Sequence, residues 1–281
     1  MVDQMINPDF FSDSEPNDNT INSTSDSIQI LNETMPSGSF SNKNAIYMDF
    51  NDIKNMKHEA ILCINARSLD DKNEHLNSML NDVDHNFDLI LLTEVWGDVL
   101  DNKIDHFEKK FTNLRKNRRG GGVAIFAKHK LKPKLFKELS IMKKEIESIG
   151  IITGKNRIVL CIYRPPLRRN EEYEIFFNEF EKLLKTCRDK YPRWDIDLCG
   201  DFNLNLLDRN SNQTTRFLNI ATTNGLFLGI NRPTRFSDND SCLDNILSTD
   251  GHTANYYICP ESLSDHCFIF KSIESNDIEE K

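Results

Sequence analysis

Short apolar runs bounded by polar residues recur along the chain from residue 59 onward. Runs of this length and setting predict buried β-strands. We interpret the following runs as strands: Glu59–Ile64, Asp88–Leu92, Gly122–Ala127, Asp195–Cys199, Leu226–Ile230, Leu243–Leu247, Tyr256–Cys259 and Cys267–Lys271. Two further runs, Ile149–Ile152 and Arg157–Tyr163, flank Gly154–Asn156 and predict a hairpin.

Apolar residues at helical spacing predict three helices between these strands. The clearest is Glu171–Lys190, where Ile175, Phe176, Phe180, Leu183, Leu184 and Cys187 form one apolar face. Leu76, Met79, Leu80 and Val83 predict a shorter helix, and Gln213–Asn224 another. Many strands with few long helices fit two sheets packed face to face with helices outside, so we expect a single-domain α/β sandwich.

The two ends of the chain have a different composition. Residues 1–57 are rich in Asn, Ser, Asp and Thr, with few aliphatic residues and no sustained period. Such a stretch cannot bury enough apolar surface to offset its ordering entropy. We therefore predict a disordered acidic segment over 1–57, a folded domain over 58–271 and an acidic tail over 272–281.

The net charge of −9 comes from these two ends. Residues 1–57 hold nine acidic and three basic residues, and 272–281 hold four and one, which leaves 31 of each sign in 58–271. Within that neutral part, residues 103–144 are strongly basic and include Lys109, Lys110, Arg115, Lys116, Arg118, Arg119, Lys128, Lys130, Lys132 and Lys134. A solvated face and a surface that follows nucleic-acid phosphates both explain such a run.

Cysteine usage and the hydropathy pattern predict an intracellular protein. The seven cysteines include no CxxC pair, and most lie in apolar runs, so we expect buried, reduced thiols. No apolar run reaches the roughly 18 residues of a membrane span. The N-terminus lacks the basic region and apolar core of a secretory signal. We expect no membrane association.

Polar residues suited to phosphodiester chemistry stand at the ends of several predicted strands. They are Asn65, Glu94, Asp201, Asn203, Asp265 and His266, together with Asp244 inside an apolar run. Each alone is typical of a turn former, a cap or a satisfied core residue. Hydrolysis of a phosphodiester needs a metal to neutralise phosphate oxygens, and hard oxygen ligands suit Mg²⁺ or Mn²⁺. The ordered set therefore points to a metal-dependent phosphodiesterase.

The glycine run at 120–122 allows two interpretations. A Gly-rich turn can cradle a phosphate. No lysine–serine signature follows it, however, and a strand comes next, which favours a strand entry with close backbone packing.

Eight fragments together carry a family resemblance. They are NARSL at 65–69, LTEVW at 92–96, GGGVA at 120–124, YRPP at 163–166, GDFN at 200–203, PTR at 233–235, LDNI at 243–246 and SDH at 264–266. This series resembles the endonuclease/exonuclease/phosphatase superfamily, which has a DNase I-like two-sheet fold. More narrowly, it resembles the endonuclease domain of non-LTR retrotransposons. The resemblance spans roughly residues 58 to 271.

The resemblance implies a role for each matching residue. Glu94 would be the principal ligand of Mg²⁺ or Mn²⁺, with Asn65 beside it and Asp265 contributing. Asp201 would position or deprotonate the attacking water. Asn203 and Tyr163 would bind the scissile phosphate. His266 would stabilise the charge of the transition state, oriented by Asp244. Contacts to DNA are expected from Arg67, Arg164, Thr234, Arg235, Ser264, Arg118 and Arg119.

The resemblance further implies that DNA is the partner, nicked to leave 3′-hydroxyl and 5′-phosphate ends. No obligate protein partner is evident. The resemblance implies a reverse transcriptase domain in the parent retrotransposon. Access to the nucleus is expected if the enzyme acts on genomic DNA. The sequence fits a detached domain, a truncated element or a domesticated copy. Abasic-site repair relatives carry an aspartate where this chain has Arg67. The site therefore has one carboxylate fewer, which weakens the case for two bound metals.

Two alternatives stay open from the sequence. One is a phosphoesterase of the same superfamily acting on RNA or on small phosphate esters, since one scaffold serves many substrates. The other is an inactive relic that only binds nucleic acid.

Overall fold

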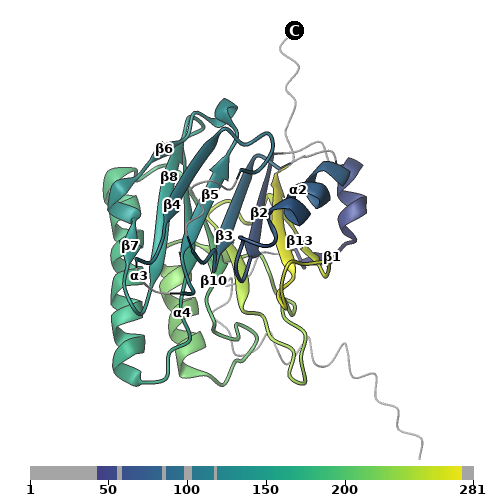
Figure 1. Cartoon of the computed structure of the whole chain (residues 1–281). Helices are drawn as coiled ribbons and strands as arrows, with labels where there is room; N and C mark the ends of the chain where they lie inside the picture. The colour runs from purple at the N-terminus through teal and green to yellow at the C-terminus, as the bar shows by residue number, and fades with distance from the viewer. Residues whose placement is uncertain (1–42, 56–58, 84–86, 98–102, 117–118, 274–281) are drawn as a thin grey trace, which may run out of the picture. The chain divides into compact units, whose positions relative to one another are not determined.

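Fourteen strands form two sheets in the computed structural model, which describes residues 43–55, 59–83, 87–97, 103–116 and 119–273 (Figure 1). The first sheet runs in the order β1 (Ile46–Tyr47), β13 (Ala254–Cys259), β14 (Phe268–Ile273), β2 (Glu59–Asn65), β3 (Leu89–Thr93), β5 (Val123–Ala127) and β4 (Lys109–Asn113). The second runs in the order β11 (Phe227–Leu228), β12 (Asp244–Ser248), β10 (Asp195–Asp201), β9 (Arg157–Tyr163), β8 (Glu147–Thr153) and β6 (Lys134–Leu135), with β7 (Ile141–Met142) also paired to β8.

The space between the two sheets is filled by inward-facing side chains of their central strands. Cys63 of β2, Cys161 of β9 and Cys199 of β10 are buried there, and the Cys161 thiol donates across the gap to the Leu92 carbonyl at 3.3 Å. All seven cysteines are buried and free, as the sequence predicted. The central strands are buried on both faces, which explains their nearly continuous apolar runs.

Helices cover the outer faces of both sheets. Helix α2 (Asn73–Asp82) places Leu76 and Leu80 in a core cluster with outward-facing residues of β2, β3, β5 and β14. Helices α3 (Asn170–Lys190) and α4 (Asn212–Thr223) lie side by side (Figure 1) and meet through stacked Phe180 and Phe217. The short 3₁₀ helices are η1 (Phe50–Asn55), η2 (His129–Leu131) and η3 (Lys137–Leu139). The predicted α/β sandwich is therefore confirmed.

Local sequence accounts for where the helices begin. Ser211 caps α4, because its Oγ accepts a hydrogen bond from the Thr214 amide at 3.2 Å. At the start of α3 the Glu172 carboxylate accepts from the backbone amides of Arg168 and Arg169, both at 3.1 Å. Among the helices of the described residues, none has the length and apolarity needed to span a bilayer.

The predicted boundary of the N-terminal segment is wrong. Residues 43–55, expected to be disordered, contain β1 and η1. Strand β1 pairs in parallel with β13, and Phe50 and Ile53 are buried in the cluster beneath α2. These few apolar residues stand in a polar stretch, so their pattern was too short to show a period. Residues 1–42 and 274–281 lie outside the described residues.

Candidate active site

The strand ends that carry the predicted site residues meet at one end of the sandwich. In the first sheet β2 and β3 run parallel and bring Asn65 opposite Thr93, next to Glu94. In the second sheet Asp201 of β10 pairs with Tyr163 of β9 and, on its other side, with Asp244 of β12. The two sheets thus present their polar strand ends to each other.

Hydrogen bonds between the sheets join these residues into one cluster. The Asn65 amide donates to Asp201 Oδ2 at 2.9 Å and to Glu94 Oε1 at 3.4 Å. The Tyr163 hydroxyl donates to Glu94 Oε1 at 2.9 Å. Burial and the nearby charge of Glu94 raise the pKa of Tyr163, so its hydroxyl remains a proton donor.

Glu94 leaves its strand in a left-handed backbone conformation, with φ of +50°. That conformation is uncommon for a residue with a side chain and is held here by neighbours. Trp96 donates from its indole Nε1 to Glu94 Oε2 at 3.1 Å, and its amide donates to the Gly121 carbonyl at 3.0 Å. Both carboxylate oxygens of Glu94 are therefore oriented by donors, and the residue is only half-buried.

Asp201 is the last residue of β10, and Asn203 lies on the turn that follows. The Asn203 backbone N–H donates to Asp201 Oδ1 at 2.8 Å, and the Asn203 side-chain Nδ2 donates to Asp201 Oδ2 at 3.1 Å. Gly200, the residue before Asp201 in β10, is required there because a Cβ would lie 1.7 Å from the Ile162 carbonyl oxygen. Burial, and then the negative charge of Asp244, raise the pKa of Asp201 to about 8.

His266 and Asp244 form a buried pair beside Asp201. The imidazole Nδ1 lies 2.8 Å from Asp244 Oδ2, which also accepts a hydrogen bond from the Thr234 hydroxyl at 2.8 Å. Burial by itself would lower the pKa of His266. The charge of Asp244 and the hydrogen bond to it outweigh this effect and raise the pKa to about 9. The imidazole is therefore mostly protonated at neutral pH.

The donor set of this cluster fits a hard divalent cation. Glu94, Asn65 and Asp201 supply carboxylate and amide oxygens within one hydrogen-bonded group. Ligand atoms of Asp201, Asp244 and His266 also lie within 4.8 Å of one another. Burial, and then the charge of Asp244, raise the pKa of Asp201, and a cation bound beside it would favour its ionised form.

Two residues expected to contact DNA are buried, and we correct both. Arg164 is 1% exposed, and its guanidinium donates to the carbonyls of Phe202 and Asn203. It therefore supports the turn that follows Asp201. Thr234 is fully buried against Asp244. In both cases the folded chain buries a polar side chain against the site, which the linear sequence could not show.

The other predicted contact residues lie nearer the surface. Arg119 is exposed and stacks over the Trp96 ring, 5.3 Å from its centre. The Ser264 hydroxyl donates to the Asn65 carbonyl at 2.8 Å. Arg67 and Arg235 both form ion pairs with Asp265. Arg118 lies outside the described residues.

The glycine run enters β5 with close backbone packing, as one of the two interpretations predicted. Gly120, Gly121 and Gly122 all have positive φ, and the last donates to the Glu147 carboxylate at 2.5 Å. Arg115, from the basic run, pairs with the same buried carboxylate. Arg115 of that run therefore stabilises the fold.

Sequence reasoning missed Trp96 and Glu147 as residues around the site. Trp96 lies two positions after Glu94 within the quoted LTEVW fragment, so its proximity was the available signal. For Glu147 we see no sequence signal, because its contacts with Arg115 and Gly122 join distant segments.

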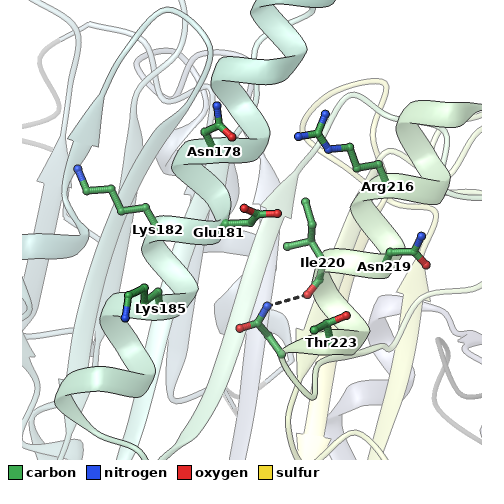
Figure 2. A pocket seen from close by; sticks show the side chains of 9 residues that line it. Asn178, Glu181, Lys182, Lys185, Arg216, Asn219, Ile220 and Thr223 are labelled. Atoms are coloured by element: carbon green, nitrogen blue, oxygen red, sulfur yellow. Dashed lines mark hydrogen bonds between the residues drawn. The ribbon is translucent and has the colours of Figure 1, made fainter.

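A groove of about 690 Å³ between α3 and α4 is separate from this cluster. Figure 2 shows Asn178, Glu181, Lys182 and Lys185 on one side and Arg216, Asn219, Ile220 and Thr223 on the other. None of the predicted site residues lines it.

Comparison with known proteins agrees with this geometry. Residues 61–266 match the Endonuclease/Exonuclease/phosphatase family, so the chain belongs to that family. It is a phosphodiester-hydrolysing enzyme, and enzymes of this family depend on a divalent metal. No curated protein matches the chain in a sequence comparison.

Three solved structures with the same fold are similar to this chain. A 3′-5′ exonuclease (NExo) from Neisseria meningitidis is 17% identical, with a TM-score of 0.58 over 76% of this chain and 99% of that one. The NExo 3′ phosphatase from Neisseria, bound to a product DNA hairpin, has the same values. An AP endonuclease from Archaeoglobus fulgidus is 13% identical, with a TM-score of 0.59 over 76% and 99%.

Proposed function

We propose that this enzyme is a DNA-nicking endonuclease of the retrotransposon type, dependent on Mg²⁺ or Mn²⁺. One observation carries the proposal: Asn65 and Glu94 from one sheet contact Asp201 and Tyr163 from the other. The protonated His266 lies beside them. A carboxylate pair, an amide bridge and a cation within one cluster suit hydrolysis of an anionic phosphodiester.

Each group has a distinct part in the proposed reaction. When bound at Glu94 and Asn65, the metal supplies neutralising charge to the phosphate oxygens. The charge of a bound cation would lower the raised pKa of Asp201 and keep that carboxylate ionised. Asp201 then orients the attacking water and accepts its proton, while Asn203 and Tyr163 hold the phosphate. Because Asp244 holds Nδ1 of His266, Nε2 is the atom that meets the charge building on the phosphoryl oxygens.

The products follow from which bond breaks. The water oxygen forms a bond to phosphorus as the bond between phosphorus and the 3′ oxygen breaks. Asp201 keeps the proton of the attacking water, and the departing 3′ oxygen takes up a proton from solvent, which leaves a 3′-hydroxyl and a 5′-phosphate. In a parent element this hydroxyl would prime a reverse transcriptase, which we propose as the associated activity. The ordered fragments of the sequence support this branch of the family.

A plasmid assay tests the proposal. Supercoiled plasmid is incubated with the full chain in Mg²⁺, Mn²⁺ or EDTA, and nicked product is extended by a DNA polymerase to detect a 3′-hydroxyl. We expect nicking only with metal, and its loss in Glu94→Gln, which keeps the shape but removes the anionic ligand. Asp189→Asn is the control, because Asp189 lies exposed on α3 and pairs with Lys185. Undiminished nicking in EDTA, or nicks that cannot be extended, would refute it.

A further inference from the structure

Two arginines from separate loops hold the side chain of Asp265. Arg67 Nη1 lies 2.5 Å from Asp265 Oδ1. Arg235 approaches the other oxygen, Oδ2, with Nε at 2.8 Å and Nη2 at 2.7 Å. Both carboxylate oxygens thus already accept charged hydrogen bonds, which are stronger than neutral ones.

The backbone fixes this trio against the catalytic cluster. Arg67 has φ of +46°, and its amide donates to Asn65 Oδ1 at 3.2 Å. The Ser264 hydroxyl, next to Asp265, donates to the Asn65 carbonyl at 2.8 Å. Arg235 forms an antiparallel bridge with His266. Each arginine is therefore anchored beside a residue of the site.

The guanidinium groups remain accessible to a ligand. The side chains of Arg67 and Arg235 are 52% and 39% exposed, while that of Asp265 is 32% exposed. A guanidinium has five N–H donors, and these contacts use one from Arg67 and two from Arg235. The remaining donors suit phosphate oxygens, for which arginine has matching planar geometry.

We infer that Arg67 and Arg235 form a clamp for the DNA phosphates beside the scissile bond, and that Asp265 is the positioning residue that orients them. The inference rests on the proposed function and departs from the metal-binding role that the family resemblance implies for Asp265. A divalent cation at this carboxylate would meet two guanidinium charges within hydrogen-bonding distance of the same oxygens, and that repulsion disfavours binding. The metal site is then formed without Asp265.

The first experiment measures metal binding without DNA. Mn²⁺ is titrated into the full chain and its variants, and the dissociation constant is obtained by calorimetry. We expect Asp265→Asn to change Mn²⁺ affinity less than twofold, whereas Glu94→Gln should abolish binding. Glu174→Gln is the matched control, since Glu174 pairs with Arg216 on the outer helices. A tenfold or greater loss of Mn²⁺ affinity in Asp265→Asn would overturn the inference.

The second experiment measures duplex DNA binding in EDTA at several salt concentrations. Each phosphate contact contributes about 0.9 to the slope of log affinity against log salt. Arg67→Gln and Arg235→Gln should each lower the slope by about that amount. Arg216→Gln, similar in exposure and charge, should leave it unchanged. Unchanged slopes in both clamp variants would overturn the clamp.

A combination of variants separates positioning from a merely structural role. Asp265→Asn should lower kcat/KM for nicking by roughly 10-fold to 100-fold through misplaced arginines. In the Arg67→Gln/Arg235→Gln background the same change should have almost no further effect, and an undiminished effect there would contradict positioning. Neither binding experiment requires nicking, so absent nicking with the expected slopes refutes only the proposed function. Melting temperatures verify that every variant is folded.

Discussion

The pair of His266 and Asp244 offers a quantitative test of the site. We consider Asp244→Asn, which keeps the size of the side chain and its capacity to accept from Thr234 while removing the charge. The pKa of His266 is raised from 6.5 to about 9. At 1.36 kcal/mol per pKa unit, this shift corresponds to about 3 kcal/mol of stability as an upper limit.

The sign of the pH dependence follows from the raised pKa in the folded state. The contribution of His266 is fully present below pH 6.5 and is lost as the pH rises through about 9. Asp244→Asn should therefore destabilise the protein by up to about 3 kcal/mol at pH 6, but by only a few tenths at pH 9.5. For a domain of this size, the larger value corresponds to roughly 6–12 °C in melting temperature.

Urea unfolding at both pH values and nicking turnover should be measured on the wild type, Asp244→Asn, His266→Ala and the double variant. Turnover should fall by about 10² to 10⁴ in each single variant, because the imidazolium acts mainly in the transition state. The double variant should be little worse than His266→Ala. An equal destabilisation at both pH values, or rate losses that multiply, would refute a cooperating charged pair.

Three further predictions concern the framework of the site. Gly200→Ala should prevent folding, because its Cβ would clash with a β9 carbonyl. Gly154→Ala is the control and should be tolerated, because its Cβ would have no contact closer than 3.5 Å. Circular dichroism of both variants shows whether each one folds. Arg164→Leu should lower nicking turnover by about 10², because the turn after Asp201 would be misplaced, while DNA affinity should stay constant. An equal loss of DNA affinity would show that Arg164 contacts DNA after all. Deletion of residues 1–42 should preserve the melting temperature. Deletion of 1–57 should cost several kcal/mol of stability, because it removes the buried side chains of Phe50 and Ile53, each worth about 2–5 kcal/mol. Equal melting temperatures of the two deletion variants would show that η1 contributes little.

Short apolar runs determined most of the strands, and they did so locally. Central strands such as β3 and β9 are buried on both faces, so their sequences are apolar throughout and easily identified. Edge strands differ. Strand β4, with the sequence KKFTN, is only partly buried and carries lysines, which are common on exposed edges. Its pattern gave no strand signal, and neither did two-residue strands such as β6.

The sequence also determined which residue types stand at the strand ends, because Asn65, Glu94, Asp201 and His266 each follow or open an apolar run. Only the tertiary structure decided what these residues contact. The fold brings segments more than 100 residues apart within hydrogen-bonding distance, as with Asn65 and Asp201. It also buries Arg164 beneath the site and joins Asp265 to two arginines. The charge and hydrogen-bonding capacity of a side chain are fixed by its residue type. Its burial and its partners depend on how the sheets pack. Burial and partners in turn set the pKa values and the accessibility on which function depends.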